Sequence, residues 1–379
     1  MGALVAVPLL IAAALGSALE APGSSRAGTS WLSFTPHPAA PYLLAAGARR
    51  DALVSLDVRN LTDRKVRVKG LRVSYLDGTR IVGSQDAGAE LFVQAGLDSD
   101  PTVAPGDRET WSGLCLVPPS ATVERARFSF ELVQHRGLRV VRSTQVLELP
   151  LQTGFARVSL TLPVRGSWRV SQGHMCDTQH RRGRVGGEFA WDLVAINDHG
   201  RSVSPLHPDS HRNADTETFG RQILAPVPGV VVDAVDGIAD NDGMTEFPRR
   251  SIVDDARDPK WIFGNHVVID AGGGAFVLLA HLKQGSLSVS KGAHVRVGDP
   301  IAEAGNSGNT VDPHLHIQVM DRPDAADPEV SGLPAAFADY LEIAAVGNGK
   351  GEVVRRRVAS GDPPQGAVLL APGPTPPAR

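Results

Sequence analysis

The sequence predicts a mainly β protein with two folded domains, preceded by an export signal and followed by a C-terminal extension. Three observations support this. The chain has 379 residues, more than one hydrophobic core usually supports. Its 40 Gly and 28 Pro, without a long run of helical periodicity, favour short strands joined by turns. Ten of its 12 His lie between His174 and His316, so the second half of the chain differs in chemistry from the first.

Residues 1–21 are expected to be a signal peptide. Residues 3–18 read ALVAVPLLIAAALGSA, an uncharged apolar run that ends in small residues near Ala18 and Ala21. Such a run is typical of a signal-peptide core and its cleavage site. A membrane anchor is the alternative, but the run is short for a spanning helix and contains Pro8. We therefore expect a secreted or periplasmic protein without stable membrane insertion.

Charge and cysteine content restrict the partners and the redox chemistry. The formal net charge of −3 gives no basic footprint, so we expect no nucleic-acid partner. Cys115 and Cys176 are the two cysteines of the chain. They could pair in an exported protein or stay as free, buried thiols, since two cysteines make no disulfide framework. The oligomeric state is left open.

Residues 22–152 are predicted to form an immunoglobulin-like β-sandwich. Ala52 to Val58 alternates apolar and polar residues before a turn, and Val66 to Tyr75 follows as a second strand. Arg125–Gln134 and Leu138–Leu149 are expected to form a hairpin. Regular short strands with turn signals are typical of this fold class. No catalytic constellation occurs here, so an accessory or positioning role is expected.

Residues 153–345 are predicted to form a second β domain that carries the chemistry. The segment from Gly264 to Met320 is a dense series of strands, and the nearly all-apolar run from Ala275 to Leu282 indicates a strand covered on both faces. The polar stretch from Asp236 to Trp261 is expected to be a surface loop near a site. Residues 346–379 end in PGPTPPAR and are expected to be a frayed, Pro-rich C-terminal extension.

Two histidines flank a leucine in the run His314-Leu315-His316-Ile317-Gln318-Val319. Side chains alternate along a strand, so His314, His316 and Gln318 share one face while the apolar residues pack into the core. Two neighbouring imidazoles suit metal binding or proton transfer. The alternative is a pair of surface histidines without a role.

His281 and Asp192 complete the candidate set. His281 closes an apolar strand and is either a rim residue or a catalyst. Asp192 lies among apolar neighbours, where a carboxylate is costly unless it is paired or bound to a cation. Histidines and one carboxylate without a dominant thiol suit Zn²⁺.

Four motifs in order resemble the lysostaphin-like zinc metallopeptidases. They are Gly264-Asn265-His266-Val267-Val268-Ile269, Ala280-His281-Leu282, Gly305-Asn306-Ser307-Gly308 and Pro313-His314-Leu315-His316-Ile317. The upstream run Ala225-Pro226-Val227-Pro228-Gly229-Val230-Val231 resembles the strand and turn before the family's catalytic hairpin. The resemblance covers about residues 166–321. It implies an antiparallel β-sheet peptidase domain with an open groove, one Zn²⁺ per chain, and endopeptidase activity on peptidoglycan peptides of a bacterial cell wall.

The resemblance also implies roles for single residues. Asp192 and His316 match zinc ligands, whereas His314 and His281 match catalytic histidines that do not bind the metal. His314 would act as general base and His281 would stabilise the oxyanion, or the two roles could be exchanged.

The first zinc ligand of the family pattern is not at its usual position. The family places a histidine four residues before the ligand Asp, where this chain has Glu188. We assign the ligand to His180, because the Gly-rich stretch that follows could loop out and return to the strand of Asp192. His174, Cys176 and Glu188 remain possible ligands in its place.

Together these features predict a secreted zinc endopeptidase that hydrolyses peptidoglycan by a metal-activated water. A second hypothesis is a catalytically degenerate relative that binds the wall or activates another hydrolase. A third is a wall-binding adhesin with structural histidines.

Overall fold

The computed structural model describes residues 30–39, 41–46, 49–86, 88–94, 97–153, 158–173, 180, 185–207, 209–244, 259–327, 329–345 and 353–371. The predicted signal peptide lies outside these residues. Nearly all regular structure is β-strand, which confirms the mainly β class. Within the described ranges, no helix has both the length and the apolar character needed to cross a bilayer.

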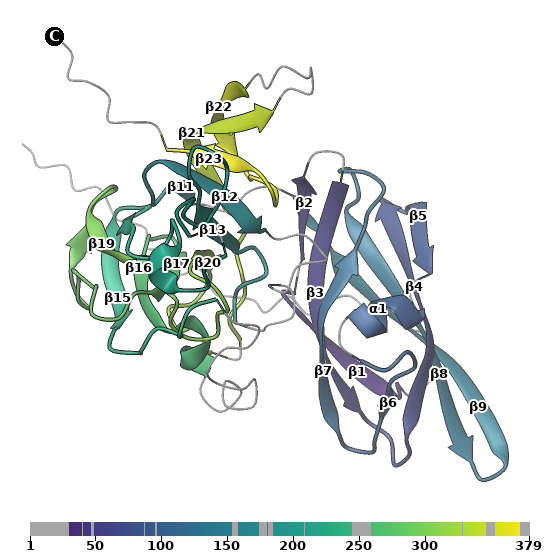
Figure 1. Ribbon diagram of the computed structural model, residues 1–379. Helices are drawn as coiled ribbons and strands as arrows, with labels where there is room; N and C mark the ends of the chain where they lie inside the picture. Colours follow the sequence, from purple (N-terminus) through teal and green to yellow (C-terminus); the bar gives the residue numbers. More distant parts are fainter. Residues whose placement is uncertain are drawn as a thin grey trace, which may run out of the picture.

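Residues 30–153 form a sandwich of two sheets, drawn in purple and blue on the right of Figure 1. The first sheet contains β1 (Leu32–His37), β2 (Tyr42–Ala46), β3 (Arg49–Asn60), β7 (Arg108–Leu116) and β10 (Gln152–Thr153). The second contains β4 (Val66–Asp77), β5 (Arg80–Asp86), β6 (Thr102–Val103), β8 (Arg125–Arg136) and β9 (Arg139–Pro150). The short helix α1 (Gly88–Gln94) packs against β4 and β7.

Both sheets bury side chains in one core around Trp111 and Phe130, whose ring centroids lie 6.2 Å apart. The predicted hairpin is present as β8 and β9, which pair antiparallel along their whole length. Two sheets around one core make a β-sandwich, as predicted. Its assignment to the immunoglobulin class stays a prediction.

The second domain is built on an eleven-stranded sheet. Its strands are β11 (Ser159–Thr161), β12 (Ser167–Gln172), β13 (Trp191–Ala195), β15 (Gly229–Val235), β16 (Asn265–Asp270), β17 (Phe276–Leu282), β18 (His294–Val295), β20 (Leu315–Met320), β21 (Ala336–Ala345), β22 (Val353–Gly361) and β23 (Val368–Leu370). A separate pair is formed by β14 (Gln222–Leu224) and β19 (Pro300–Glu303), and two 3₁₀ turns cover Asn213–Asp215 and Pro259–Phe263. The central strands run in the order β12-β13-β20-β17-β16-β15 and pair antiparallel.

Strand β20 shows how the sheet separates core from site. Leu315, Ile317 and Val319 point into the main core of the domain. On the opposite face lie His316 and Gln318, and Met320 there joins a smaller apolar cluster. This is the alternation predicted from the sequence. Because apolar side chains cover both faces, the central strands are almost completely buried.

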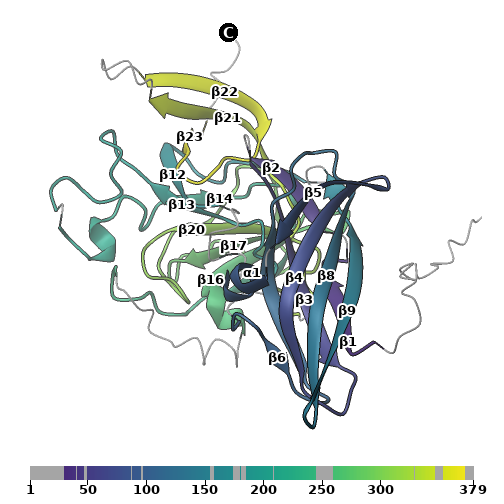
Figure 2. The same ribbon diagram turned by 90° about the vertical axis from the view of Figure 1, so that its right-hand side faces the viewer.

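The described part of the C-terminal segment is not the frayed extension that was expected. β23 pairs with both β12 and β21, and Leu369 on it is fully buried. The Trp191 indole on β13 also donates a hydrogen bond to Asp362 Oδ1 at 3.2 Å. Sheet residues therefore continue past residue 345, the expected domain boundary. The C-terminal segment is polar because β22 is exposed to solvent, and not because the segment is frayed. β22 pairs with β21 in a two-stranded ribbon at the top of Figure 2.

Candidate metal and catalytic site

Strand register brings Asp192 and His316 together. Asp192 on β13 lies directly opposite His316 on β20, and His316 lies opposite Ala280 on β17. Neighbouring strands are about 4.8 Å apart, so side chains on one face of directly opposed residues can touch. His281 follows Ala280 at the end of β17 and reaches the same end of the sheet. Three adjacent strands thus supply the predicted chemistry although their residues are far apart in sequence.

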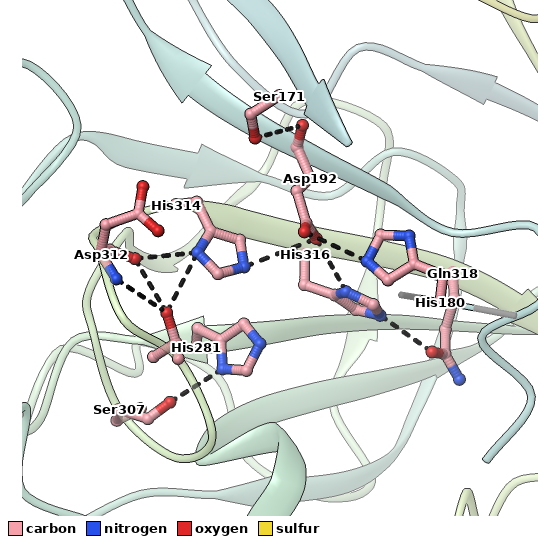
Figure 3. Close-up of polar contacts among 10 residues, drawn as sticks. Ser171, His180, Asp192, His281, Ser307, Asp312, His314, His316 and Gln318 are labelled. Carbon is pink, nitrogen blue, oxygen red and sulfur yellow. Dashed lines mark hydrogen bonds and ion pairs between the residues drawn. The ribbon is translucent and has the colours of Figure 1, made fainter. Parts of the chain in front are cut away.

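His180, Asp192 and His316 form one cluster, shown in Figure 3. His316 Nδ1 lies 2.9 Å from Asp192 Oδ1, and His180 Nε2 lies 3.1 Å from Asp192 Oδ2. One potential ligand atom of each residue lies within 4.8 Å of the others. Two imidazole nitrogens and one carboxylate oxygen are the donors of many catalytic zinc sites, which keep a fourth position open. The cluster therefore fits Zn²⁺.

The carboxylate of Asp192 carries the negative charge of the cluster. Burial alone would raise the pKa of Asp192, but the neighbouring His180 and His314 hold it well below its usual value. Its side chain is 6% exposed. An ionised carboxylate at this depth requires positive charge beside it. A divalent cation bound between Asp192 and the two imidazoles would supply that charge.

The structure places His180, and not Glu188, in the cluster. Glu188 Oε2 accepts a hydrogen bond from the backbone N–H of Gly332 at 2.9 Å. Glu188 is absent from the group that could hold a metal ion among the described residues. His174 and Cys176, the remaining candidates for this ligand, lie outside the described residues. The geometry thus brings together the three residues that the sequence analysis assigned to zinc.

His281 is held in one orientation by a backbone carbonyl. Its Nδ1 donates to Ser307 O at 2.8 Å, so the neutral ring carries its lone pair on Nε2. The ring centroid lies 4.7 Å from that of His314. His281 has a φ of 57°, a left-handed conformation that costs a non-glycine residue about 1–2 kcal/mol. Burial, with His314 and His316 nearby, lowers the pKa of His281 well below its usual value.

Gly264 allows the Ser307 carbonyl to approach. A Cβ on Gly264 would lie 2.3 Å from Ser307 O, and its φ of 58° is also one that glycine adopts easily. The glycine of this motif therefore has a structural role. It leaves room for the turn at residues 305–308, whose Ser307 carbonyl orients His281.

His314 lies just before β20, next to the carboxylate. Its Nδ1 donates to the Asp312 carbonyl at 2.9 Å, and its Nε2 lies 3.5 Å from Asp192 Oδ1. Burial alone would lower the pKa of His314, but Asp192 and Asp312 raise it to about 9. These two groups therefore favour the protonated form of His314.

The described start of the polar insert lies beside the site, as expected. Asp240 Oδ1 accepts from the backbone N–H of Asn306 at 2.7 Å, and Asn241 donates to Gly308 O at 3.1 Å. These bonds brace the turn at residues 305–308 that carries the Ser307 carbonyl. The sequence analysis gave no role to Asp240 or Asn241, since isolated Asp and Asn in a turn-rich loop carry no distinctive signal.

Gln318 is a further residue that sequence reasoning left without a role. The alternation placed it on the face of His316, and the structure shows that it contacts that histidine directly. Its Oε1 lies 2.9 Å from His316 Nε2, and its Nε2 donates to Val185 O at 2.8 Å. Gln318 is fully buried.

Comparison with known proteins gives a family for part of the chain. Residues 210–328 match the model of peptidase family M23. The matched segment contains His281, His314 and His316 and begins after His180 and Asp192. No curated protein matches the chain significantly.

Several solved structures are similar to this chain at low identity. A zinc-containing peptidase from Vibrio cholerae is 14% identical, with 78% of this chain and 86% of that chain covered and a TM-score of 0.25. A putative peptidase M23 from Pseudomonas aeruginosa is also 14% identical, with 67% and 87% covered and a TM-score of 0.27. The catalytic domain of the prophage-encoded M23 protein EnpA from Enterococcus faecalis is 15% identical, with 38% and 73% covered and a TM-score of 0.23.

Proposed function

Because residues 210–328 match the model of peptidase family M23, we propose that this chain is a zinc-dependent endopeptidase that hydrolyses peptide bonds of bacterial peptidoglycan outside the cytoplasm. The observation that carries the proposal is the cluster of His180, Asp192 and His316, with two further histidines directly beside it. A complete donor set supports an active enzyme over a degenerate relative that only binds the wall.

The three clustered residues would hold the metal and leave one position open. Zn²⁺ held there supplies the Lewis acidity that activates water and polarises a scissile carbonyl. Asp192 contributes one negative charge, so it would neutralise the charge of the bound Zn²⁺ only in part and preserve its Lewis acidity. The low exposure of the three side chains keeps bulk water from competing with the substrate.

The hydrogen bonds of His281 and His314 favour different catalytic roles for the two residues. His281 donates Nδ1–H to Ser307 O and presents a lone pair at Nε2, which suits it to accept a proton from the attacking water. His314, between Asp192 and the Asp312 carbonyl, is suited to hold a proton at Nε2 and donate it to the oxyanion or the leaving amine. This is the second of the two assignments that the sequence left open.

Two observations support export to the cell wall. The apolar segment at residues 3–18 is typical of a signal peptide. Cys115 is disulfide-bonded, and disulfides persist mainly in oxidising compartments outside the cytoplasm. The substrate class comes from the lysostaphin-like motifs, whose family acts on peptidoglycan peptides.

Digestion of purified peptidoglycan tests the proposal. We expect the mature protein to release fragments with new amino termini, which mass spectrometry of the soluble products would identify. A chelator should abolish the release and added Zn²⁺ should restore it. His316→Ala serves as the matched inactive control, because it removes one proposed zinc ligand from β20. Intact peptidoglycan after incubation with the zinc-loaded protein would contradict the proposal.

A further inference from the structure

Gln318 has an amide whose orientation is fixed by its surroundings. Its Nε2 donates to Val185 O at 2.8 Å, and a carbonyl oxygen can only accept. The NH₂ group must therefore face Val185, and Oε1 must face His316. Gly186 permits this close packing: a Cβ there would lie 3.3 Å from Gln318 Nε2, and its φ is 72°.

The orientation of the amide decides which nitrogen of His316 carries a hydrogen. Gln318 Oε1 can only accept, and it lies 2.9 Å from His316 Nε2. Nε2 must therefore be the donor, which leaves the lone pair of the neutral ring on Nδ1. That atom lies 2.9 Å from Asp192 Oδ1, another acceptor. Two acceptors at this distance repel unless a proton or a metal cation lies between them, and Zn²⁺ would take the place of that proton on binding.

From these contacts we infer that Gln318 is a positioning residue for the metal: it presets His316 in the tautomer whose Nδ1 binds Zn²⁺. Val185 precedes the loop that leads to Asp192, whereas Gln318 lies on the strand of His316. The bond from Gln318 to Val185 thus joins the two segments that carry these ligands. Metal-binding histidines commonly donate their second N–H to such a partner, which raises the basicity of the ligand atom and fixes the ring. The inference rests on the proposed zinc site but not on the identity of the substrate.

A direct measurement is the tautomer of His316 in the zinc-free, full-length protein. Nitrogen NMR of ¹⁵N-histidine-labelled protein at pH 8, assigned by comparison with His316→Ala, should show a protonated Nε2, because Gln318 Oε1 can only accept. An unprotonated Nε2 overturns the inference. This measurement needs no substitution at Gln318, so it holds even if such variants fold poorly.

Zinc affinity separates tautomer control from simple packing. Competition with a chromogenic chelator, with Zn²⁺ alone as the probe, should show a loss of about 10–100-fold for Gln318→Met, which fills the space but accepts no hydrogen bond. Gln318→Glu keeps the acceptor for His316 but loses the donor to Val185 O, so it should lose less zinc affinity than Gln318→Met. Met320→Leu removes only the weak contact of the Gln318 amide with Met320 Sδ at 3.5 Å and leaves the bonds to Val185 and His316, so it should cost less zinc affinity than Gln318→Met.

The outcomes distinguish this inference from the proposed function. Equal losses in Gln318→Met and Gln318→Glu, or none in Gln318→Met, overturn the role of Gln318 while wall cleavage by the wild type stands. Zinc binding without wall cleavage overturns the proposed function and leaves the inference intact. A wild type that binds no zinc overturns both.

Discussion

Replacing His180 by alanine tests the assignment on which the zinc site depends most. His180 supplies the donor that faces Asp192 Oδ2, on the side of the carboxylate away from His316. Glu188 occupies the position that the family pattern gives to this ligand, but its carboxylate accepts from Gly332 N. We expect His180→Ala to lose zinc and Glu188→Ala to retain it.

The size of the loss follows from the number of donors. Zinc held by four ligands in small domains is bound with about 10–16 kcal/mol, so one ligand contributes roughly 2.5–4 kcal/mol. Since each 1.4 kcal/mol corresponds to tenfold in affinity, His180→Ala should weaken zinc binding by about 10²–10³-fold. Glu188→Ala removes the hydrogen bond from the Gly332 N–H, among other contacts, and should lower the free energy of unfolding by at least about 1–3 kcal/mol without a comparable loss of zinc.

Two measurements on the same samples separate these effects. Chelator competition gives the zinc affinity, and denaturant unfolding of the zinc-free protein gives the stability. A His180→Ala variant that binds zinc like the wild type would refute the ligand assignment. If Glu188→Ala lost zinc while His180→Ala retained it, the ligand would have to be assigned to Glu188.

Three further expectations follow from the geometry. His316→Ala should lose zinc by elemental analysis, because it removes a donor, and a full complement of zinc in this variant would contradict the ligand set. His281→Ala and His314→Ala should keep most of the zinc but lose turnover by roughly 10²–10⁴-fold in a peptidoglycan release assay; a joint loss of zinc would make them ligands. A fragment of residues 158–371 should unfold cooperatively without the N-terminal sandwich. A shorter fragment, 158–345, should have a lower melting temperature by circular dichroism, because it lacks β22 and β23. Equal melting temperatures would contradict this expectation.

The parts of the fold that sequence predicts well are those with strong local patterns. The hairpin of β8 and β9 follows from two alternating runs around a short turn. The face of β20 that carries His316 follows from the same alternation. The pairing of β23 with β12 could not be predicted, because Trp168 and Leu369 lie about two hundred residues apart and neither run alone is distinctive.

The candidate site divides in the same way. His281, His314 and His316 are found from motifs, since each lies in a short run of recognisable residues. His180 had to be chosen among several candidates, because no spacing rule connects it to Asp192. Gln318 was visible on the right face but without a function: its role depends on the carbonyl of Val185, a backbone atom from a distant segment. Every residue has a backbone carbonyl, so the sequence does not indicate which one a side chain will contact.

The place of β23 has a consequence for the order of events during synthesis. Strand β12 lies between β23, almost at the end of the described chain, and β13, which carries Asp192. A ribosome makes the chain from its N-terminus, so β12 stays without one of its two neighbours until residue 370 has emerged. The N-terminal sandwich, whose last strand ends at Thr153, can close long before that. In a protein exported as proposed, the strand that neighbours β13 would therefore gain its second partner only long after the last proposed ligand, His316, has been made.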